Sequence, residues 1–303
     1  MEQQKRHAFL ITAHNKKEML LNLLALLDDP EHDIYIHIDK KAREISETEL
    51  TKAAPHSRVS FVPRLDARWG SEVFIDAIVS LIELASREEH AFYHLLSGVD
   101  LPLKPMREIR AYFEAHAGEE FVAFERETAA PQVIEGRIAR WKLRQPVNPL
   151  LKKIYRKAAP LLEAMQKALG VNRIKDAPVV FHKGAVWFSI THALARYVVA
   201  AMPRYRAYYR RSSCADEIWL QTLVADSPFI ERRAFMGWDD EFAATMRYID
   251  WPDNAMSPRT LTSADYDKLM QSGMLFARKF DDAVDAEVIR RISRSVRMQT
   301  EQA

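Results

Sequence analysis

The sequence predicts an α/β fold with a mostly parallel central sheet and a basic helical insertion. Apolar segments typical of buried strands alternate with amphipathic segments typical of helices as far as residue 125, and the alternation resumes at residue 179. The 303 residues are 48% hydrophobic and 28% charged, an ordinary globular mixture that can bury a large core without disulfides. We expect a single domain over residues 1–303.

The first half of the chain contains the clearest strand and helix patterns. Residues 7–12 are a continuous apolar run, which favours a buried strand. The helix expected at 14–29 has one apolar face, formed by Met19, Leu20, Leu23, Leu24 and Leu27. Further strands are expected at 33–39, 58–64, 90–98 and 118–125, and further helices at 71–85 and 105–116.

The middle of the chain, residues 137–175, is rich in basic and poor in acidic side chains. Its basic residues are Arg137, Arg140, Lys142, Arg144, Lys152, Lys153, Arg156, Lys157, Lys167, Arg173 and Lys175. One interpretation is a solvated helical insertion. The alternatives are a surface for an anionic acceptor or for an anionic membrane.

The α/β pattern then returns. Residues 179–190 predict a hairpin or paired strands around Gly184, and Thr191 caps the helix that follows. Another helix is expected at 215–224 and a strand within 241–251. A helix is expected to begin at Thr262 or Ser263, and the C-terminal helix is expected at about 285–298.

Composition excludes several classes of protein. The 8 glycines are too widely spaced to form GxGxxG or GxxxxGK[ST], so a bound phosphate would need side-chain cations. The single cysteine, Cys214, excludes an intrachain disulfide and a cysteine-based zinc site and favours a reducing compartment. We find neither a signal peptide nor an apolar run long enough to span a membrane. The net charge of +2 gives no nucleic-acid signature.

Several polar residues lie where ligands bind in open α/β sheets, just beyond strand ends. Asp39, Ser97 and Asp100 have such positions, although a carboxylate there is often only a turn former. Glu217 lies near an expected helix start, which also suits a carboxylate that only complements the helix dipole.

Other groups have different interpretations. The cations at positions 247, 278 and 279 lie among aromatic residues and need an anionic partner, either a carboxylate or a phosphate. The pair Asp265 and Asp267 could hold a divalent metal but is better explained by capping of a helix start. The histidines lack metal-binding spacing, and Cys214 lacks a nucleophile signature.

In chain order, these segments resemble the core-2/I-branching glycosyltransferases, the group of β-1,6-N-acetylglucosaminyltransferases that includes peptide O-xylosyltransferases. The matching segments are LITAHNKKEML, IYIHIDKKA, ARWGSEVFIDAIVSLI, YHLLSGVDLPLK, KGAVWFSITHALARYV, CADEIWLQTLV, MRYIDW and LFARKF. They cover most of the chain, from about residue 11 to residue 280. The last of them, with the stretch before it, is closer to the xylosyltransferase branch.

The resemblance implies a GT-A-like fold and a metal-independent, inverting transfer of a sugar from a UDP-sugar. By position, Asp39 and the pair Thr12 and Ala13 correspond to donor-binding residues. Glu217 corresponds to the catalytic base, while Arg247 and Lys279 correspond to the cations that bind the diphosphate. Glu125, Arg140 and Trp141 match the acceptor region more loosely. Trp69 with Gly70 corresponds to a family signature of mainly architectural role.

The resulting hypothesis is a bacterial enzyme that transfers GlcNAc or xylose from a UDP-sugar to a glycan acceptor in surface polysaccharide synthesis. We expect it to need no metal ion or other cofactor. The expected location is cytoplasmic, with possible peripheral contact with an anionic membrane, and no nucleic acid is expected as a partner. The alternatives are a non-catalytic sugar-nucleotide or glycan-binding relative and a membrane-surface scaffold.

Overall fold

The computed structural model describes residues 5–68, 70–126, 130–144, 146, 148–252, 255 and 257–301. Its centre is a six-stranded sheet in the order β3-β2-β1-β4-β7-β6. The strands are β1 (His7–Ala13), β2 (His32–Ile38), β3 (Arg58–Phe61), β4 (Phe92–Ser97), β6 (Phe121–Val122) and β7 (Phe188–Thr191).

Most of this sheet is parallel. Strand β1 runs parallel to both of its neighbours, β2 and β4, and β2 runs parallel to β3. Strand β7 is antiparallel to β4 on one side and to β6 on the other. The predicted α/β class with a mostly parallel central sheet is confirmed.

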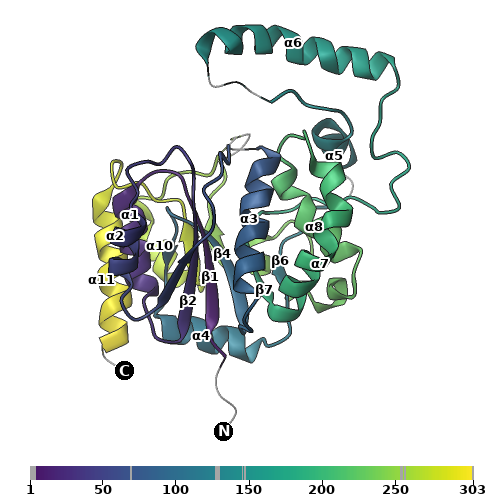
Figure 1. Ribbon diagram of the computed structural model, residues 1–303. Coiled ribbons are helices and arrows are strands. Elements are labelled where there is room, and N and C mark those ends of the chain that lie inside the picture. The colour runs from purple at the N-terminus through teal and green to yellow at the C-terminus, as the bar shows by residue number, and fades with distance from the viewer. Residues whose placement is uncertain are drawn as a thin grey trace.

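Helices cover both faces of the sheet because apolar side chains on successive strand positions point to opposite sides. Ala8 and Leu10 of β1 belong to the core on the face of α3 (Glu72–Ala85), α7 (His192–Tyr209) and α8 (Trp219–Ala225). Phe9 and Ile11 belong to the core on the face of α1 (Lys17–Leu27), α2 (Glu47–Ala53) and α4 (Met106–Ala115). Figure 1 shows the sheet between these two sets of helices.

A small second sheet brings the C-terminal part of the chain against α1. It pairs β5 (Leu101–Pro102), β9 (Phe276–Arg278) and β8 (Arg247–Ile249), in that order. A third core joins this sheet with α10 (Tyr266–Gln271), α11 (Ala286–Glu301) and α1. The shorter elements here and nearby are η1 (Ala215–Glu217), η2 (Pro228–Arg232), α9 (Glu241–Thr245) and η3 (Ser263–Asp265).

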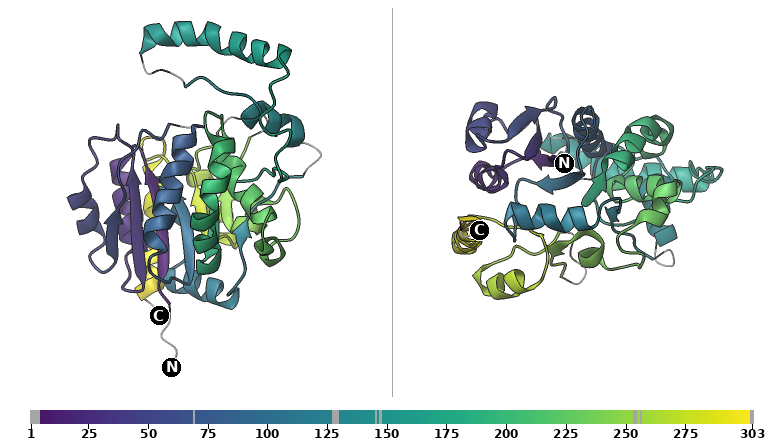
Figure 2. Two further views of the ribbon diagram at one scale, coloured as in Figure 1. Left: turned by 45° about the vertical axis from the view of Figure 1, so that its right-hand side comes forward. Right: turned by 90° about the horizontal axis from the view of Figure 1, so that it is seen from below.

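The basic middle of the chain forms an arm. Helix α5 (Ala130–Ile138) lies against the domain, and helix α6 (Pro149–Ala168) stands off from it, as Figures 1 and 2 show. The arm closes at its base, where the amide of Arg173 donates to the carbonyl of Ala139 at 2.9 Å. In the described parts of the chain, no helix has both the length and the hydropathy needed to cross a membrane.

Two expected elements differ from the structure. The hairpin predicted around Gly184 is absent from residues 179–190, where β7 is the one strand formed. The amide of Gly184 instead donates to the backbone carbonyl of Glu217. A Cβ at position 184 would lie 1.9 Å from the Ala123 carbonyl oxygen. The helix predicted at 215–224 is divided into η1 and α8 at Ile218.

Candidate active site

The carboxyl ends of β1, β2 and β4 meet at one edge of the sheet, where the donor-binding residues were predicted. The amide of Asp39 donates to Ala13 at 2.7 Å, and the amide of Gly98 donates to Thr12 at 3.0 Å. The structure therefore brings Thr12, Ala13 and Asp39 together. The Asp39 side chain is buried and accepts the Lys41 amide at 2.8 Å, so it also forms the turn that the sequence allowed.

Asp100 lies in the loop after β4 at the same edge, and its carboxylate binds the guanidinium of Arg278. Its carboxylate accepts the Ser97 hydroxyl and amide, and it accepts Nε of Arg278 at 3.1 Å. The guanidinium of Arg278 lies 4.0 Å from the centre of the Trp187 ring, a cation–π geometry. Arg278 is thus held in place at the edge of the sheet by a buried carboxylate and an aromatic face.

Arg247, predicted to bind the diphosphate, is placed in the interior. Its side chain is 1% exposed, and its guanidinium donates to the carbonyls of Thr245, Phe188 and Leu95 and to the Ser189 hydroxyl. Burial lowers the pKa of this group to about 10. In this arrangement Arg247 is a buried cation that joins β8 to β4 and β7, and its contact with a diphosphate stays a prediction.

Lys279, the other predicted diphosphate cation, lies at the surface. Its Nζ donates to the Ser257 hydroxyl at 2.6 Å. The next amide, that of Phe280, donates to the carbonyl of Val99 at 3.0 Å. Lys279 therefore follows Arg278 beside the loop that carries Asp100, and these two neighbours place positive charge at the carboxyl edge.

Glu217 lies on η1 within a cluster of charged side chains. Its Oε2 accepts NH1 of Arg137 at 2.5 Å and lies 3.5 Å from Nζ of Lys183. Lys183 also donates to Glu125, a residue predicted for the acceptor region. The Glu217 side chain is 29% exposed, so its carboxylate is oriented by two cations yet open to solvent. Sequence reasoning noted Arg137 only as one of many basic residues and did not identify Lys183.

Two further carboxyl groups near this cluster carry shifted pKa values. Burial, with the charge of Glu217 beside it, raises the pKa of Asp216 to about 6. Burial also raises the pKa of Glu241, which accepts Nε1 of Trp251 at 3.2 Å, to about 7. The charges of Arg278, which lowers this pKa, and of Glu125, which raises it, both act on Glu241. No motif in the sequence marked Glu241.

Arg140 and Trp141, also predicted for the acceptor region, lie at the base of the arm. Nε of Arg140 is 3.5 Å from Glu163 of α6, and the backbone of Trp141 bonds to the Gln166 side chain in both directions. The Arg173 guanidinium lies 3.6 Å from the centre of the Trp141 ring and covers one of its faces. In this structure both residues contact α6, whereas Glu125 joins the Glu217 cluster.

The Asp-x-Asp pair has the capping role that the sequence favoured. Asp265 accepts the amide of Thr262 at 2.8 Å in a capping box and forms an ion pair with Arg259. Among the residues that the structure describes, no group of three or more His, Cys, Asp or Glu side chains is arranged to hold a metal ion. The predicted pair Trp69 and Gly70 is described only in part, because Trp69 lies outside the described residues.

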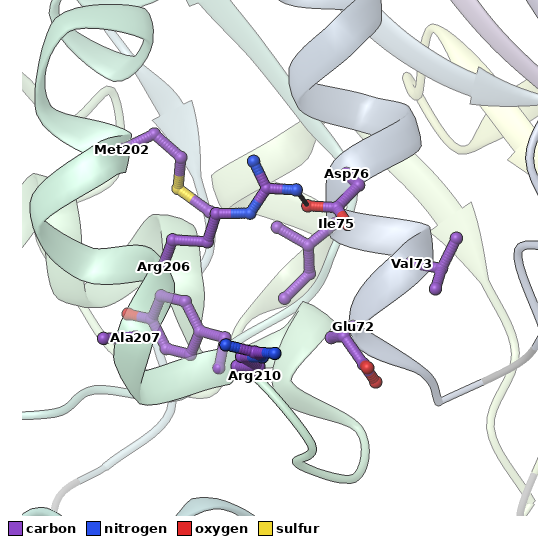
Figure 3. A pocket seen from close by; sticks show the side chains of 9 residues that line it. Glu72, Val73, Ile75, Asp76, Met202, Arg206, Ala207 and Arg210 are labelled. Carbon is purple, nitrogen blue, oxygen red and sulfur yellow. Dashed lines mark ion pairs between the residues drawn. The ribbon is translucent and has the colours of Figure 1, made fainter. Parts of the chain in front are cut away.

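A cavity of about 430 Å³ lies between α3 and α7, away from these residues. Figure 3 shows Arg206 reaching from α7 to Asp76 on α3, and the two side chains form an ion pair at 2.8 Å. The lining consists of Glu72, Val73, Ile75, Asp76, Met202, Arg206, Ala207, Tyr209 and Arg210. It includes none of the predicted site residues.

The fold is α/β, and its candidate ligand site lies at the carboxyl edge of the parallel strands. The family model described as Core-2/I-Branching enzyme matches residues 7–271, and the chain belongs to this family. The resemblance drawn from the sequence motifs is thereby confirmed at the level of the family. The bacterial origin stays a prediction.

Curated relatives include two xylosyltransferases. The chain is 23% identical to xylosyltransferase 2 of Rattus norvegicus and 21% identical to xylosyltransferase 1 of Homo sapiens, each over 305 residues. These alignments cover 94% of this chain but 33% and 30% of the relatives, so the chain spans about a third of their length. A solved structure of mouse xyloside xylosyltransferase 1, in its apo form, matches 74% of this chain and 83% of that chain, with 11% identity and a TM-score of 0.32.

Proposed function

We propose that this protein is an inverting, metal-independent glycosyltransferase that moves GlcNAc or xylose from a UDP-sugar to a hydroxyl of a glycan acceptor. One observation supports this most directly. Glu217, the residue that matches the family's catalytic base, is solvent-accessible, and its carboxylate forms ion pairs with Arg137 and Lys183. A role in surface polysaccharide synthesis and a cytoplasmic location remain predictions, as does membrane contact of the enzyme.

In the proposed reaction, Glu217 removes the proton of the acceptor hydroxyl. The acceptor oxygen forms a bond to C1 of the sugar while the bond from C1 to the diphosphate oxygen breaks, and UDP leaves with the electron pair. Attack from the opposite face inverts C1. The cations Arg278 and Lys279 stabilise the charge that develops on the diphosphate, which is the contribution a metal ion makes in other enzymes.

The geometry of the neighbouring edge supports a donor-binding role for it. Thr12 and Ala13 end β1 beside Asp39, and the loop of Asp100 joins them through the Gly98 amide. We assign the nucleoside to this edge and the diphosphate to the adjoining Arg278 and Lys279. The buried Arg247 stabilises the neighbouring strands, because its guanidinium donates to backbone carbonyls of β4 and β7.

The test is the Glu217→Gln variant in an assay of UDP release from UDP-GlcNAc and UDP-xylose. Loss of a general base lowers the rate by roughly 10²–10⁴-fold. The dissociation constant of UDP is expected to stay unchanged, because Glu217 acts on the acceptor. Glu231→Gln, which changes an exposed glutamate of η2, is the matched control and keeps full activity.

Two results would contradict this proposal. Near-normal turnover by Glu217→Gln would remove the base from its assigned role. Complete loss of activity in EDTA, restored by a divalent metal, would refute metal independence.

A further inference from the structure

Helix α6 carries an apolar stripe that faces solvent. Leu150, Ile154, Leu161 and Met165 are separated by 4, 7 and 4 residues, which places them on one side of an α-helix. These side chains are 72%, 63%, 63% and 51% exposed. Gln166 is the buried residue among the described side chains of α6, and it contacts the base of the arm rather than the stripe.

The exposure of large apolar side chains is concentrated in this region. Of the fourteen such side chains in the described part of the chain, ten lie between residues 133 and 180. Isolated exposed apolar residues need no explanation, but a contiguous patch marks a surface that binds something. Figures 1 and 2 show α6 beyond the body of the domain in views that differ by rotation, so the domain itself leaves the helix uncovered.

Charge selects among the surfaces that could cover this helix. Five basic residues of α6 accompany the stripe, against one acidic residue: Lys152, Lys153, Arg156, Lys157 and Lys167 are opposed by Glu163. Glu163 already forms ion pairs with Lys142 and Lys167. A second copy of the chain would bring the same cations against these, which is unfavourable.

We propose that α6 is an interfacial helix that docks the protein on an anionic lipid surface. An apolar stripe with lysine and arginine beside it lies in the plane of a membrane interface, where the stripe enters the acyl boundary and the cations contact anionic headgroups. The long side chains of Lys153 and Lys157 can reach such headgroups while their stems lie on apolar surface. Docking is independent of the chemistry at Glu217.

The base of the arm sets the orientation of the docked domain. The amide of Ser213 donates to the backbone carbonyl of Arg137 at 3.1 Å, and the amide of Lys142 donates to the backbone carbonyl of Arg211 at 2.8 Å. These bonds tie the arm to the turn that precedes Glu217. Figure 1 shows α6 at the end of the molecule opposite the N-terminus, beyond the ends of the strands that begin near that terminus. A docked α6 thus holds the carboxyl edge toward the lipid.

The experiment is co-sedimentation of the full chain with phosphatidylcholine vesicles, with and without about 30% phosphatidylglycerol, in about 0.1 M salt. We expect at least a roughly tenfold preference for the anionic vesicles. Ile154→Asp/Leu161→Asp is expected to lower that partitioning by at least about tenfold, because two carboxylates enter the apolar stripe. Val284→Asp/Met298→Asp is the matched control: it makes the same change of charge at two exposed apolar sites elsewhere and keeps wild-type partitioning.

A second variant isolates the cations. Lys153→Gln/Arg156→Gln/Lys157→Gln is expected to lower binding to anionic vesicles by more than about tenfold, because each cation near an anionic surface is worth a factor of roughly five. Circular dichroism with thermal unfolding verifies that every variant is folded.

Three results would overturn the proposal. The first is a wild-type protein that stays in the supernatant with anionic vesicles. The second is unchanged partitioning of Ile154→Asp/Leu161→Asp. The third is a dimer in sedimentation equilibrium that the same variant dissociates without lipid, which would identify a second copy of the chain as the occupant.

Discussion

Arg247 shows how the surroundings of a residue decide its role. Its place in MRYIDW indicated a diphosphate ligand, and an anionic partner was expected for a cation in apolar surroundings. The partners are backbone carbonyls of β4 and β7 and of Thr245. Sequence could not reveal this because the direction of the side chain depends on the pairing of β8 with β9 and on the packing of that small sheet.

The first prediction separates the roles of Arg247 and Lys279. Arg247→Met leaves buried carbonyls unpaired and is expected to lower Tm by roughly 5–10 °C. Lys279→Met removes a surface cation and is expected to leave Tm unchanged while it weakens UDP binding by about tenfold or more. Thermal unfolding and calorimetric titration with UDP measure the two effects. A loss of UDP affinity in Arg247→Met without any fall in Tm would show that Arg247 binds the diphosphate.

The residues around Glu217 illustrate the other limit of sequence reasoning. Glu125, Arg137, Lys183 and Glu217 are far apart in the chain, and each looks like an ordinary surface charge in its own segment. They meet because η1 turns back against the segment of Gly184, whose lack of a side chain permits the close approach to Ala123. The position of Glu217 was predictable from its motif, but the two cations that orient it were not.

At the scale of elements, prediction succeeded where burial is regular. The strands β1, β2 and β4 and the helices α1, α3 and α4 all lie within three residues of the expected bounds, because a full apolar face leaves little choice of structure. Prediction failed at 179–190, where a glycine permits contact with another segment rather than a hairpin. Helices α2 and α5 were not predicted, and both are short elements with weak apolar faces.

The second prediction concerns the arm and belongs to the scale of elements. Replacement of residues 140–172 by a two-glycine linker is expected to change Tm by only a few degrees. The ends of the arm already meet at the bond between Arg173 and Ala139, and Gln166 is the buried described side chain of α6. Thermal unfolding of the shortened protein is the measurement. Failure to fold cooperatively would mean that the arm is part of the core.

At the scale of the whole molecule, three buried histidines make stability depend on pH. His7, His32 and His94 are buried residues of β1, β2 and β4, and Nδ1 of His7 is 2.9 Å from Nε2 of His94. Burial lowers the pKa of His7 to about 3, with His32 adding to the effect, and lowers that of His32 to about 4. Nε2 of His32 lies 3.1 Å from the Arg110 guanidinium, so it acts as an unprotonated acceptor.

The third prediction follows from the sign of these shifts. A histidine whose pKa is depressed by folding stabilises the native state fully above pH 6.5, and that stability is lost as the pH falls, because the unfolded chain takes up the proton first. His7→Gln removes one such group. Its deficit in unfolding free energy relative to wild type is expected to shrink by up to about 1.4 kcal/mol for each pH unit below 6.5.

Urea unfolding of both proteins at several pH values between 7.5 and 5 measures this difference. The comparison isolates His7 from groups with the opposite tendency, such as Glu120, whose pKa is raised to about 7 by burial. A deficit that stays constant with pH would show that His7 titrates normally in the folded protein.

The closed base of the arm has a consequence for chain entropy. A loop whose ends are joined pays for closure with a cost that rises only with the logarithm of its length, about 0.6 kcal/mol for each doubling. Residues 139 and 173 are already joined by a backbone hydrogen bond. Inserted segments of quite different length between them would therefore have nearly the same free-energy cost of loop closure. The domain could therefore exchange one surface-binding helix for another, and with it one site of attachment for another, without a change in the packing of its core.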